Sequence, residues 1–551
     1  MKENSTKMNQ NLKKFYFGIL LVSGSFSSLL CQEETIPASP NLLLIICDDL
    51  NDAIHGMGGH PQAITPHIDQ LSSRGVRYTS AQCNAPLCGP SRASLWSGLY
   101  PHTTGYYGYN QQRNRWRNNK ILKNTVTLFE HMAHNGYQVF ATGKIHHNGH
   151  EDRSIFRNED GRNGFSVEAS FGPYPWDGDS ATAALSIRGV MHPDFPENFH
   201  DFRWTEGFGE VRDISDSYEG NGSWLYDHWG TVFEIDKTGK RDLMPDERCT
   251  EYALSVLQRK HKKPFFLTIG YNRPHSPQYV PEKYFDLYGI DTLLLPPCLA
   301  DDIEDCSPTA ISGRDVQGIS VGRYKLKRLR DAGGREMWRR WVQAYLASVT
   351  FVDDQIGQVL AELNSSEYAA NTLVIVTSDH GYHMGEKELI FKNTLWEEST
   401  RVPLVFAGPG IAGNMECSKP VSLVDLYPTI LDYCNLPADP NKDGNHKNLD
   451  GFSLVPLLKN PGSGHWNGPD IAVTAVCSQQ PLQTDQPGPV DQQHYSVRSE
   501  RYRYIHYRNG DEELYDHRYD PYEWFNLSAD QSYLDLKTGL KKKLFQLIDP
   551  S

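Results

Sequence analysis

Four short apolar runs stand out along the chain, and each ends in polar or ionisable residues. They read NLLLIIC from 41 to 47, YQVFATG from 137 to 143, PFFLTIG from 264 to 270 and TLVIVTS from 372 to 378. A continuous apolar run is typical of a strand buried on both faces. We therefore expect a parallel or mixed sheet covered by helices. Its ligand crevice should lie where the strands end.

Between these runs the periodicity changes. From Met337 to Leu363, apolar and aromatic residues recur at helical spacing, which predicts a long helix with a buried face. The segment from 150 to 246 is rich in Gly, Asp, Pro, Trp and Phe without sustained periodicity. It predicts long loops over the crevice, which are uncommon unless they are functional.

The C-terminal part has a different pattern. Residues 436 to 494 are dense in Pro, Asn, Asp and Gly, which indicates a boundary. HYSVRSERYRYIHYRNGDEELYDH then alternates with a two-residue period and contains Asn509-Gly510, a strong hairpin signal. A chain of 551 residues is longer than the length that a single hydrophobic core usually accommodates. We expect a larger domain over 38–440 and a smaller C-terminal α+β domain over 441–551, built on an antiparallel sheet.

The net charge limits the kinds of partner that we expect, and the N-terminal sequence indicates where the protein is located. The formal net charge of −14 disfavours nucleic acid as a partner. Lys13-Lys14 precede the short apolar stretch FYFGILLVSGSFSSLL, which predicts a signal peptide over 1–31 and export to the periplasm or the exterior. Cys31 follows at once, where a lipoprotein signal places its cysteine, although Leu30 is larger than such signals prefer. Contact with a membrane is expected only if Cys31 is lipidated.

Carboxylates follow two of the strands. Asp48 and Asp49 end the first run, and Asp379 with His380 follows the fourth. Neighbouring carboxylates repel each other unless a cation lies between them, and oxygen-rich sets favour Ca²⁺ or Mg²⁺. Helix capping at 48–49 and a polar turn at 379–381 are the alternatives.

Cys88 raises a separate question. Pro90 suits a first helical turn, so Cys88 is expected at the positive end of a helix, where a thiolate or another anion is stabilised. A disulfide with Cys83 is the structural alternative. Sulfur is a poor match for a hard cation, which argues against the thiol as the final metal ligand.

These residues resemble a known family. Cys88-Gly-Pro-Ser-Arg92 resembles the C-x-P-S-R signature of type I sulfatases, whose cysteine becomes formylglycine (3-oxoalanine). Asp48-Asp49, Gly143-Lys144 and TSDHG resemble the family's metal and lysine motifs. GKIHHNG, GYNRPHSP and FKNTLWEESTRVPLVF resemble segments of iduronate-2-sulfatase and its bacterial relatives. The resemblance spans roughly residues 40 to 435 and returns at DEELYDHRYDPYEWFNL.

The resemblance implies an alkaline-phosphatase-like α/β fold, with a large mixed sheet flanked by helices, and it implies roles for single residues. Asp48, Asp49, Asp379 and His380 would hold Ca²⁺, or Mg²⁺, together with residue 88. Arg92, Lys144 and Lys392 would neutralise the sulfuryl oxygens. His275, with Lys392, would protonate the leaving sugar hydroxyl, and His147 would take the proton that releases sulfate, with His146 as its neighbour. A formylglycine-generating enzyme would be the maturation partner.

The implied function is hydrolysis of sulfate esters on carbohydrates. The expected substrates are 2-sulfated uronates of glycosaminoglycans or a sulfated sugar of a marine algal polymer such as ulvan, with His383 and Tyr106 as substrate contacts. One alternative is a phosphatase or phosphonate monoester hydrolase on the same scaffold. The other is a non-catalytic sugar-binding relative in which Cys88 stays unconverted.

Overall fold

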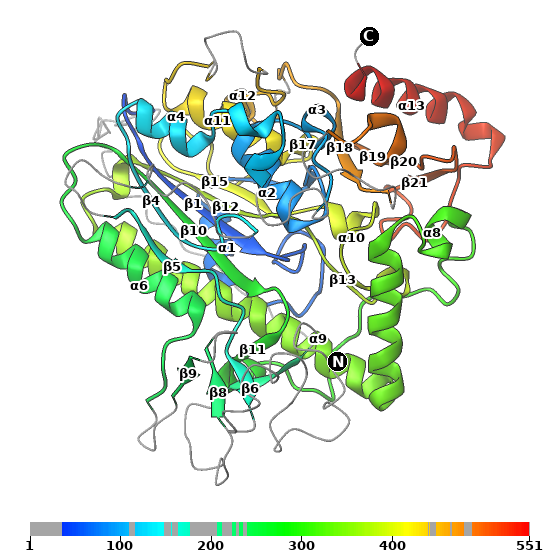
Figure 1. Cartoon of the computed structure of the whole chain (residues 1–551), viewed down its shortest axis with the longest axis horizontal. Coiled ribbons are helices and arrows are strands. Elements are labelled where there is room, and N and C mark those ends of the chain that lie inside the picture. The colour runs from blue at the N-terminus through cyan, green and yellow to red at the C-terminus, as the bar shows by residue number, and fades with distance from the viewer. Residues whose placement is uncertain are drawn as a thin grey trace, which may run out of the picture. The chain divides into compact units, whose positions relative to one another are not determined.

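A mixed eight-stranded sheet lies at the centre of the part of the chain that the structure describes (Figure 1). The predicted runs form four adjacent interior strands, which are parallel to one another, so their carboxyl ends meet at one edge. The expectation of a buried mixed sheet is confirmed. In order across the sheet the strands are β16 (Met415–Cys417), β2 (Val76–Tyr78), β15 (Leu404–Ala407), β12 (Thr372–Ser378), β1 (Asn41–Asp48), β10 (Phe265–Pro274), β4 (Gln138–Gly143) and β5 (Phe165–Glu168).

This computed structural model describes most of the chain beyond residue 35. The predicted signal over 1–31 and Cys31 lie outside the described residues, as does much of the segment from 148 to 239. No helix in the described ranges is long and apolar enough to cross a bilayer. Those ranges are 36–108, 116–147, 156, 163–176, 207–211, 223–226, 231–234, 240–438, 440, 448–462, 465–478 and 487–549.

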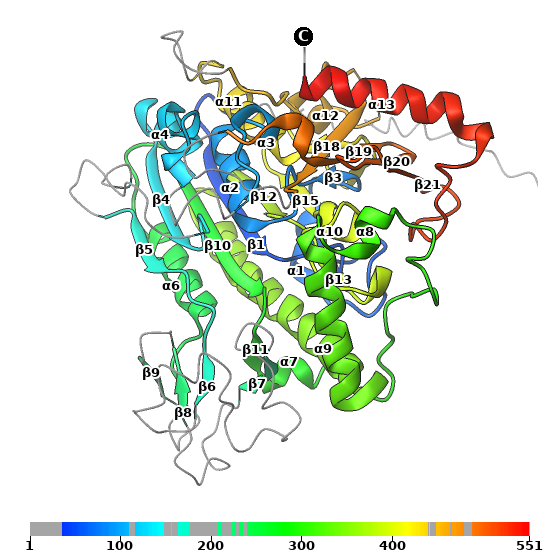
Figure 2. The same cartoon turned by 45° about the vertical axis from the view of Figure 1, so that its right-hand side comes forward.

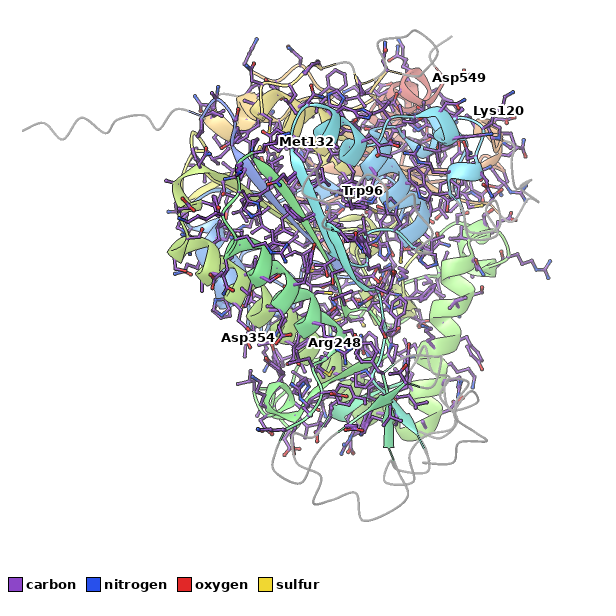
Figure 3. The ribbon with its side chains drawn as sticks, turned by 60° about the vertical axis from the view of Figure 1, so that its left-hand side comes forward. Trp96, Lys120, Met132, Arg248, Asp354 and Asp549 are labelled. Carbon is purple, nitrogen blue, oxygen red and sulfur yellow. The ribbon has the colours of Figure 1, made fainter. Side chains whose placement is uncertain are left out.

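Helices cover both faces of the sheet (Figure 2). Successive side chains of β1 point to opposite faces, so Leu43 and Ile45 enter one core and Leu44 and Ile46 the other. The first core lies against α1 (Pro66–Ser72), α6 (Pro245–Leu257) and α9 (Gln317–Ser365). The second lies against α2 (Cys88–Ser97), α4 (Leu128–His134), α11 (Leu426–Tyr433) and α12 (Val455–Lys459). Figure 3 shows Trp96 and Met132 on one side of the sheet and Arg248 and Asp354 on the other.

The predicted helix from 337 to 363 is the second half of α9. Non-helical backbone at Gly333 and Gly334, the latter with φ 64°, interrupts α9 before this half begins. The predicted apolar face is buried throughout, from Trp338 to Leu363. Shorter described helices are α3 (Pro101–Thr104), α7 (Glu282–Phe285), α8 (Pro308–Ser312) and α10 (Glu397–Thr400).

A second, antiparallel sheet occupies the C-terminal part, as predicted. The Asn509-Gly510 turn joins its last two strands, with Gly510 at φ 91°. Leu540 and Leu544 of α13 (Leu534–Ile548) pack on this sheet. The sheet consists of β18 (Ile471–Val476), β19 (His494–Ser499), β20 (Tyr502–His506) and β21 (Glu512–Asp516). The boundary near residue 440 stays a prediction.

The structure describes short strands in parts of the segment from 150 to 246, for which long loops were predicted. β5 joins the central sheet, and β7 (Phe208–Val211) pairs with β11 (Gln278–Pro281). A small antiparallel sheet contains β6 (Tyr174–Trp176), β8 (Ser223–Leu225) and β9 (Val232–Phe233). These strands are two to four residues long, too short for a periodic pattern to reveal them. The remaining pairs are β3 (Ala81–Gln82) with β17 (Val421–Ser422), and β13 (His383–Met384) with β14 (Ile390–Phe391).

Candidate active site

The adjacent ends of β1 and β12 bring the predicted carboxylates together. Asp48 is the last residue of β1, and Asp49 turns the chain with a positive φ of 67°. The Asp49 backbone is held at both ends, because its N–H donates to Asp379 Oδ1 at 3.3 Å and its carbonyl accepts from Tyr345 Oη at 2.8 Å. Tyr345 belongs to the buried face of α9. The long helix therefore positions a turn that a local sequence pattern alone does not define.

Cys88 is the first residue of α2 and is fully buried at the centre of the site. Its Sγ lies 3.4 Å from Asp48 Oδ1, 3.2 Å from His380 Nε2 and 3.4 Å from Lys392 Nζ. Cys83 and Cys88 are both free thiols, and Cys83 Sγ faces the Ser399 carbonyl at 3.7 Å. The alternative of a Cys83–Cys88 bridge is therefore wrong for this structure.

Each carboxylate has its own cationic partner. Lys144 Nζ donates to Asp48 and Lys392 Nζ donates to Asp49. Arg92 Nε donates to Asp379 Oδ2 at 2.8 Å, and another Arg92 nitrogen lies 3.7 Å from Asp48 Oδ1. All six side chains are almost completely buried. The site is thus a desolvated cluster of alternating charges, in which electrostatic effects are strong.

These charges shift the pKa values of the site. Burial raises the pKa of Asp379 to about 6, with Arg92 opposing the rise. Burial acts to lower the pKa of His380, but Asp379 and Cys88 raise it to about 9. Burial opposes ionisation of Cys88, yet Lys144 and Lys392 hold its pKa well below the usual value. An anion at position 88 is therefore favoured.

The residues fit a hard divalent cation. Ligand atoms of Asp48, Asp49, Cys88 and His380 all lie within 4.8 Å of one another. Asp49 Oδ2 is buried without a hydrogen bond from any described residue. Asp379 is not one of these four, but its Oδ1 lies 3.7 Å from His380 Nε2. An unsatisfied carboxylate oxygen among carboxylates is the donor chemistry that Ca²⁺ and Mg²⁺ require.

The three candidate histidines have different surroundings. His147 forms a hydrogen bond with Cys88, and burial lowers its pKa. His146 instead stacks on Trp116, with ring centroids 5.2 Å apart. His275 Nε2 lies 3.7 Å from Asp49 Oδ2, and its side chain is 17% exposed. His275 thus lies next to the carboxylate cluster and is also partly accessible to solvent.

Two residues that the sequence reasoning missed support this site. The Phe171 ring lies 5.0 Å from Lys144 Nζ and 4.8 Å from the His275 ring. Asp246 accepts the backbone N–H groups of Asn272 and Arg273 at 2.8 and 2.9 Å, which orients the chain before His275. Asp246 lies in the first turn of α6, and an acidic residue at the start of a helix can be recognised in the sequence. Nothing in the sequence distinguishes Phe171 from a packing residue.

The two predicted substrate contacts are buried. His383 is inaccessible, with its Nε2 2.8 Å from Thr394 Oγ1, and burial lowers its pKa to about 3. Tyr106 packs with Ala93, Trp116 and Leu122 and is 2% exposed. The charge at Cys88 adds to burial in raising the pKa of Tyr106, so this ring lies near Cys88. Their roles in substrate binding stay predictions.

Comparison with known proteins supports these observations. Residues 40–436 match the family model described as Sulfatase, and residues 385–549 match the one described as N-sulphoglucosamine sulphohydrolase, C-terminal. A sulfatase from Formosa agariphila is 35% identical over 489 residues, which are 88% of this chain and 82% of that protein.

More distant relatives name specific activities. Delta 4,5-hexuronate-2-O-sulfatase from Bacteroides thetaiotaomicron is 28% identical, covering 90% of this chain and 85% of its own. Iduronate 2-sulfatase from Homo sapiens is also 28% identical, covering 74% of this chain and 71% of its own. A phosphonate monoester hydrolase from Silicibacter pomeroyi shares the fold, with a TM-score of 0.64, 18% identity, and coverage of 92% of this chain and 94% of its own.

Proposed function

The chain belongs to the sulfatase family, and we propose that it hydrolyses sulfate esters on saccharides released from sulfated polysaccharides. The observation that carries the proposal is the position of Cys88. Its Sγ lies within 3.4 Å of a carboxylate, an imidazole and an ammonium group, at the start of a helix. That arrangement suits a nucleophile in an anion-binding, metal-ready pocket.

The residues fit the two groups that the family implies, formylglycine at position 88 and a divalent cation. Asp48, Asp49, Asp379 and His380 would hold the cation, for which Ca²⁺ is proposed and Mg²⁺ is the alternative. Formylglycine at position 88 would supply a nucleophilic hydroxyl, and the cation would supply a Lewis acid that polarises the sulfuryl group. An oxygen at position 88 would also suit a hard cation better than the thiol does.

The chain's own cations bind and orient the sulfate group. Lys144, Lys392 and Arg92 lie in or beside the carboxylate cluster, already desolvated and fixed by ion pairs. Fixed positive charge stabilises the negative charge that spreads over the sulfuryl oxygens in the transition state, and it does so without reorganisation. Neutral lysine variants should therefore lower kcat more than they raise KM.

Two histidines move protons. His275, the partly exposed one, is proposed to donate from Nε2 to the ester oxygen of the leaving sugar, with Lys392 beside the same Asp49 carboxylate. His147, hydrogen-bonded to residue 88, is proposed to accept the proton that residue 88 loses when sulfate departs. A histidine whose pKa is lowered by burial is neutral near pH 7 and can act as a base.

The substrate class rests on the relatives. Those at 28% identity act on 2-sulfated hexuronate and iduronate, as their names state, and another relative from Formosa agariphila is called an ulvan-active sulfatase. We propose a uronate 2-sulfate of glycosaminoglycan origin, with a sulfated sugar of an algal polymer such as ulvan as the alternative. Both place the sulfate on a carbohydrate hydroxyl.

A paired assay tests the proposal. Protein produced with a formylglycine-generating enzyme is given unsaturated 2-sulfated hexuronate disaccharides, ulvan oligosaccharides, and the phosphate and phosphonate esters of 4-nitrophenol. Sulfate release from a saccharide at least about 10³-fold more efficient than phosphate or phosphonate release is expected. A preference for the phosphorus esters would instead identify the hydrolase alternative.

Export is part of the proposal. The basic and apolar stretch before Cys31 supports transfer to the periplasm or the exterior, where large sulfated saccharides are met. Cell fractionation should recover the protein outside the cytoplasm. If Cys31 is lipidated, Cys31→Ala should move the protein from the membrane fraction to the soluble one.

A further inference from the structure

The first half of α9, residues 317–332, packs directly on the segment that carries Lys392. At Gly318 the two backbones are so close that an added Cβ would come within 2.2 Å of the Lys392 carbonyl oxygen. Gly322, on the same face of the helix, faces the Phe391 side chain. The buried residues of this face are Gly318, Ile319, Gly322, Leu326 and Leu329. One side of the helix is therefore fixed against the segment of a proposed catalytic lysine.

The other side of this helix carries an excess of positive charge. Residues 323–340 contain eight Lys and Arg and two acids, a net charge of +6, in a chain whose formal net charge is −14. Each of the two acids has one basic partner, because Asp331 pairs with Lys327 and Glu336 pairs with Arg340. The remaining positive charges are not balanced within this stretch. We call six of its residues the basic surface: Tyr324, Lys325, Lys327, Arg328, Arg330 and Arg335.

Tyr324 lies in the middle of the exposed side of the helix. Its side chain is 50% exposed, and the Arg328 guanidinium carbon lies 5.7 Å from its ring centroid. Lys327, three residues further on, is 72% exposed and lies next to Tyr324 on the same side. An aromatic ring among cations suits a sulfated sugar, which presents C–H groups on its ring face and sulfate groups at its edge.

Arg330 and Arg335 lie on either side of the break in α9, and both are exposed. Neither forms an ion pair with any residue that the structure describes. Burial raises the pKa of the Cys298 thiol, and both arginines oppose this rise, which places the two guanidinium groups near the same thiol. A guanidinium group binds an oxyanion through two parallel hydrogen bonds. Two adjacent arginines without carboxylate partners therefore suit the sulfate groups of one chain.

The basic surface borders the active-site lysine segment. Lys325 Nζ lies 4.5 Å from the centroid of the Phe391 ring, and Lys392 Nζ lies 6.0 Å from the same centroid. The two ammonium groups are therefore at most 10.5 Å apart, which is the sum of these distances. Figures 1 and 2 show this half of α9 beside β13, which pairs with the strand that ends at Phe391.

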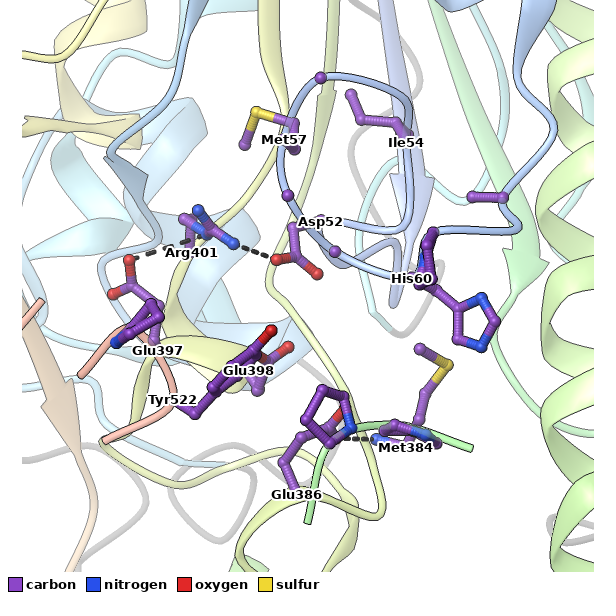
Figure 4. Close-up of a pocket in the computed structure, with 18 of the residues that line it drawn as sticks. Asp52, Ile54, Met57, His60, Met384, Glu386, Glu397, Glu398, Arg401 and Tyr522 are labelled. Atoms are coloured by element: carbon purple, nitrogen blue, oxygen red, sulfur yellow. Dashed lines mark hydrogen bonds and ion pairs between the residues drawn. The ribbon is translucent and has the colours of Figure 1, made fainter. Parts of the chain in front are cut away.

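A nearby cavity of about 880 Å³ suits an anionic ligand less well (Figure 4). Four carboxyl groups and two guanidinium groups line it, from Asp52, Glu386, Glu397, Glu398, Arg401 and Arg498. Figure 4 shows Arg401 directed at Asp52 and Glu397, with which it pairs, and Arg498 also pairs with Glu397. The positive charges of the cavity are thus paired and outnumbered. A sulfated chain is therefore expected on the basic surface.

We propose that the basic surface binds the sulfate groups of a sulfated polysaccharide and holds the enzyme on that polymer. The choice of this polyanion rests on the proposed function, and the proposal extends that function from the sulfated sugar unit to its polymer. The bound chain need not enter the active site. Holding the enzyme on the polymer raises the effective concentration of sulfated sugar ends around it.

Binding to heparin, a sulfated glycosaminoglycan, tests the surface independently of catalysis. Full-length Cys88→Ala protein is titrated into fluorescently labelled heparin at several salt concentrations, with and without the triple change Lys327→Gln, Arg330→Gln and Arg335→Gln. The triple change should raise the Kd about tenfold or more and should lower the slope of log Kd against log salt concentration by about two. Unchanged affinity would overturn the proposal, as would equally tight binding of desulfated heparin to the Cys88→Ala protein.

A matched control removes the same charge at the opposite edge of the sheet. Lys260, Lys262 and Lys263 are exposed and precede β10, at the amino end of the parallel strands. Changing all three to Gln should alter the Kd for heparin less than about twofold. An equal loss in this control would show a dependence on overall charge and would overturn the defined surface. Tighter binding to double-stranded DNA or to phosphatidylserine vesicles than to heparin would assign another partner and overturn the proposal.

Kinetics of the matured protein connect the surface to activity. Long heparin oligosaccharides that end in unsaturated 2-sulfated hexuronate are compared with the disaccharide that has the same end. The triple change should lower kcat/KM about fivefold to tenfold on the long chains and leave it unchanged on the disaccharide. Unchanged kcat/KM on the long chains would overturn the role in holding the enzyme on its polymer. No sulfate release from either substrate would contradict the proposed function, whereas the binding experiment would still decide whether the surface exists.

Discussion

Two buried clusters in this protein hold acids, bases and possible metal ligands, and they differ in how their charges are satisfied. At the catalytic cluster around Cys88, Asp49 Oδ2 and one Arg92 nitrogen have no hydrogen bond within the described residues. At the second cluster, Glu397, His517 and Glu523 also bring ligand atoms within 4.8 Å. There Arg503 Nε donates to Glu523 at 2.5 Å and His517 Nε2 lies 2.8 Å from the same oxygen.

The second cluster is complete without a cation. Glu523 Oε2 also accepts the Glu397 N–H at 2.9 Å, and Arg503 and Arg498 both bind Glu397. None of these side chains has an unsatisfied buried polar atom in the described part of the chain. Closeness of ligand-type residues therefore does not identify a metal site. An unsatisfied buried oxygen among carboxylates supports the proposal of one, and of these two clusters the one around Cys88 has such an oxygen among the described residues.

The largest effect is expected when the thiol of Cys88, at the centre of the catalytic cluster, is removed. Cys88→Ala should reduce sulfate release by about 10³-fold or more, because the nucleophile is lost. The melting temperature should stay close to that of the parent protein. Cys83→Ala, an equally buried thiol outside the cluster, is the control and should keep its activity. Full activity in Cys88→Ala would exclude residue 88 as the nucleophile.

Removing a carboxylate tests the cation. Calcium should raise the melting temperature of the parent protein, because a ligand that binds the folded state stabilises it. Asp49→Ala should abolish this rise and lower activity about 10²-fold or more. Glu523→Gln, which changes the second cluster, should keep the calcium response. A calcium-dependent rise that survives Asp49→Ala but not Glu523→Gln would reverse the assignment of the two clusters.

The second cluster should matter for stability. Glu523→Gln removes a buried carboxylate from Arg503 and His517, and an unpaired buried charge costs about 3–5 kcal/mol. Urea unfolding should show this loss, with kcat on the sulfated disaccharide unchanged. An unchanged urea midpoint would show that the network contributes nothing to folding.

Phe171 offers a finer test at the catalytic cluster. Its ring covers Lys144 and His275, and a desolvated cation–π contact is worth about 1–2 kcal/mol. Phe171→Ala should lower kcat/KM on a sugar sulfate about tenfold and shift the pH profile of kcat. Phe171→Tyr should restore most of it. The loss should be smaller with 4-nitrophenyl sulfate, whose leaving group needs no proton. Equal losses on both esters would indicate a merely structural role.

The smallest effect concerns an ion pair outside both clusters. Although burial opposes it, hydrogen bonds from Lys537, Tyr504 and Lys541 lower the pKa of Glu512 to about 2. A lowered carboxyl pKa stabilises the fold above pH 4.5, and this contribution is lost as the pH falls from about 4.5 toward 2. Glu512→Gln should cost at most about 1 kcal/mol at pH 7, since the pair is partly solvated. Its urea midpoint should approach that of the parent protein as the pH falls from 4.5 and should meet it below about pH 2. A constant difference would contradict the assignment.

Much of the fold follows from the apolar pattern. The four runs became adjacent parallel strands because uninterrupted apolar residues fit only positions covered on both faces, and the Asn509-Gly510 turn defined the C-terminal hairpin. The short strands β6, β8 and β9 were missed because two or three residues carry no period. Their pairing depends on contacts that are distant in the chain.

For the catalytic cluster, the motif residues could be predicted from the sequence, but the residues that support them could not. Motif residues such as Asp48, Cys88 and Lys144 come together because each follows a strand or starts a helix at one edge. Phe171 and the partners of Glu523 could not be predicted, since their significance depends on which side chains they contact in three dimensions.

The mass of the peptide that contains residue 88 tests the central claim most directly. The protein is produced with and without a formylglycine-generating enzyme, digested, and measured beside its rate of sulfate release from the 2-sulfated disaccharide. The account predicts an aldehyde at position 88 only in the matured protein, with activity rising in proportion to the converted fraction. Activity that is equal in the two preparations, with cysteine intact at position 88 in both, would contradict it.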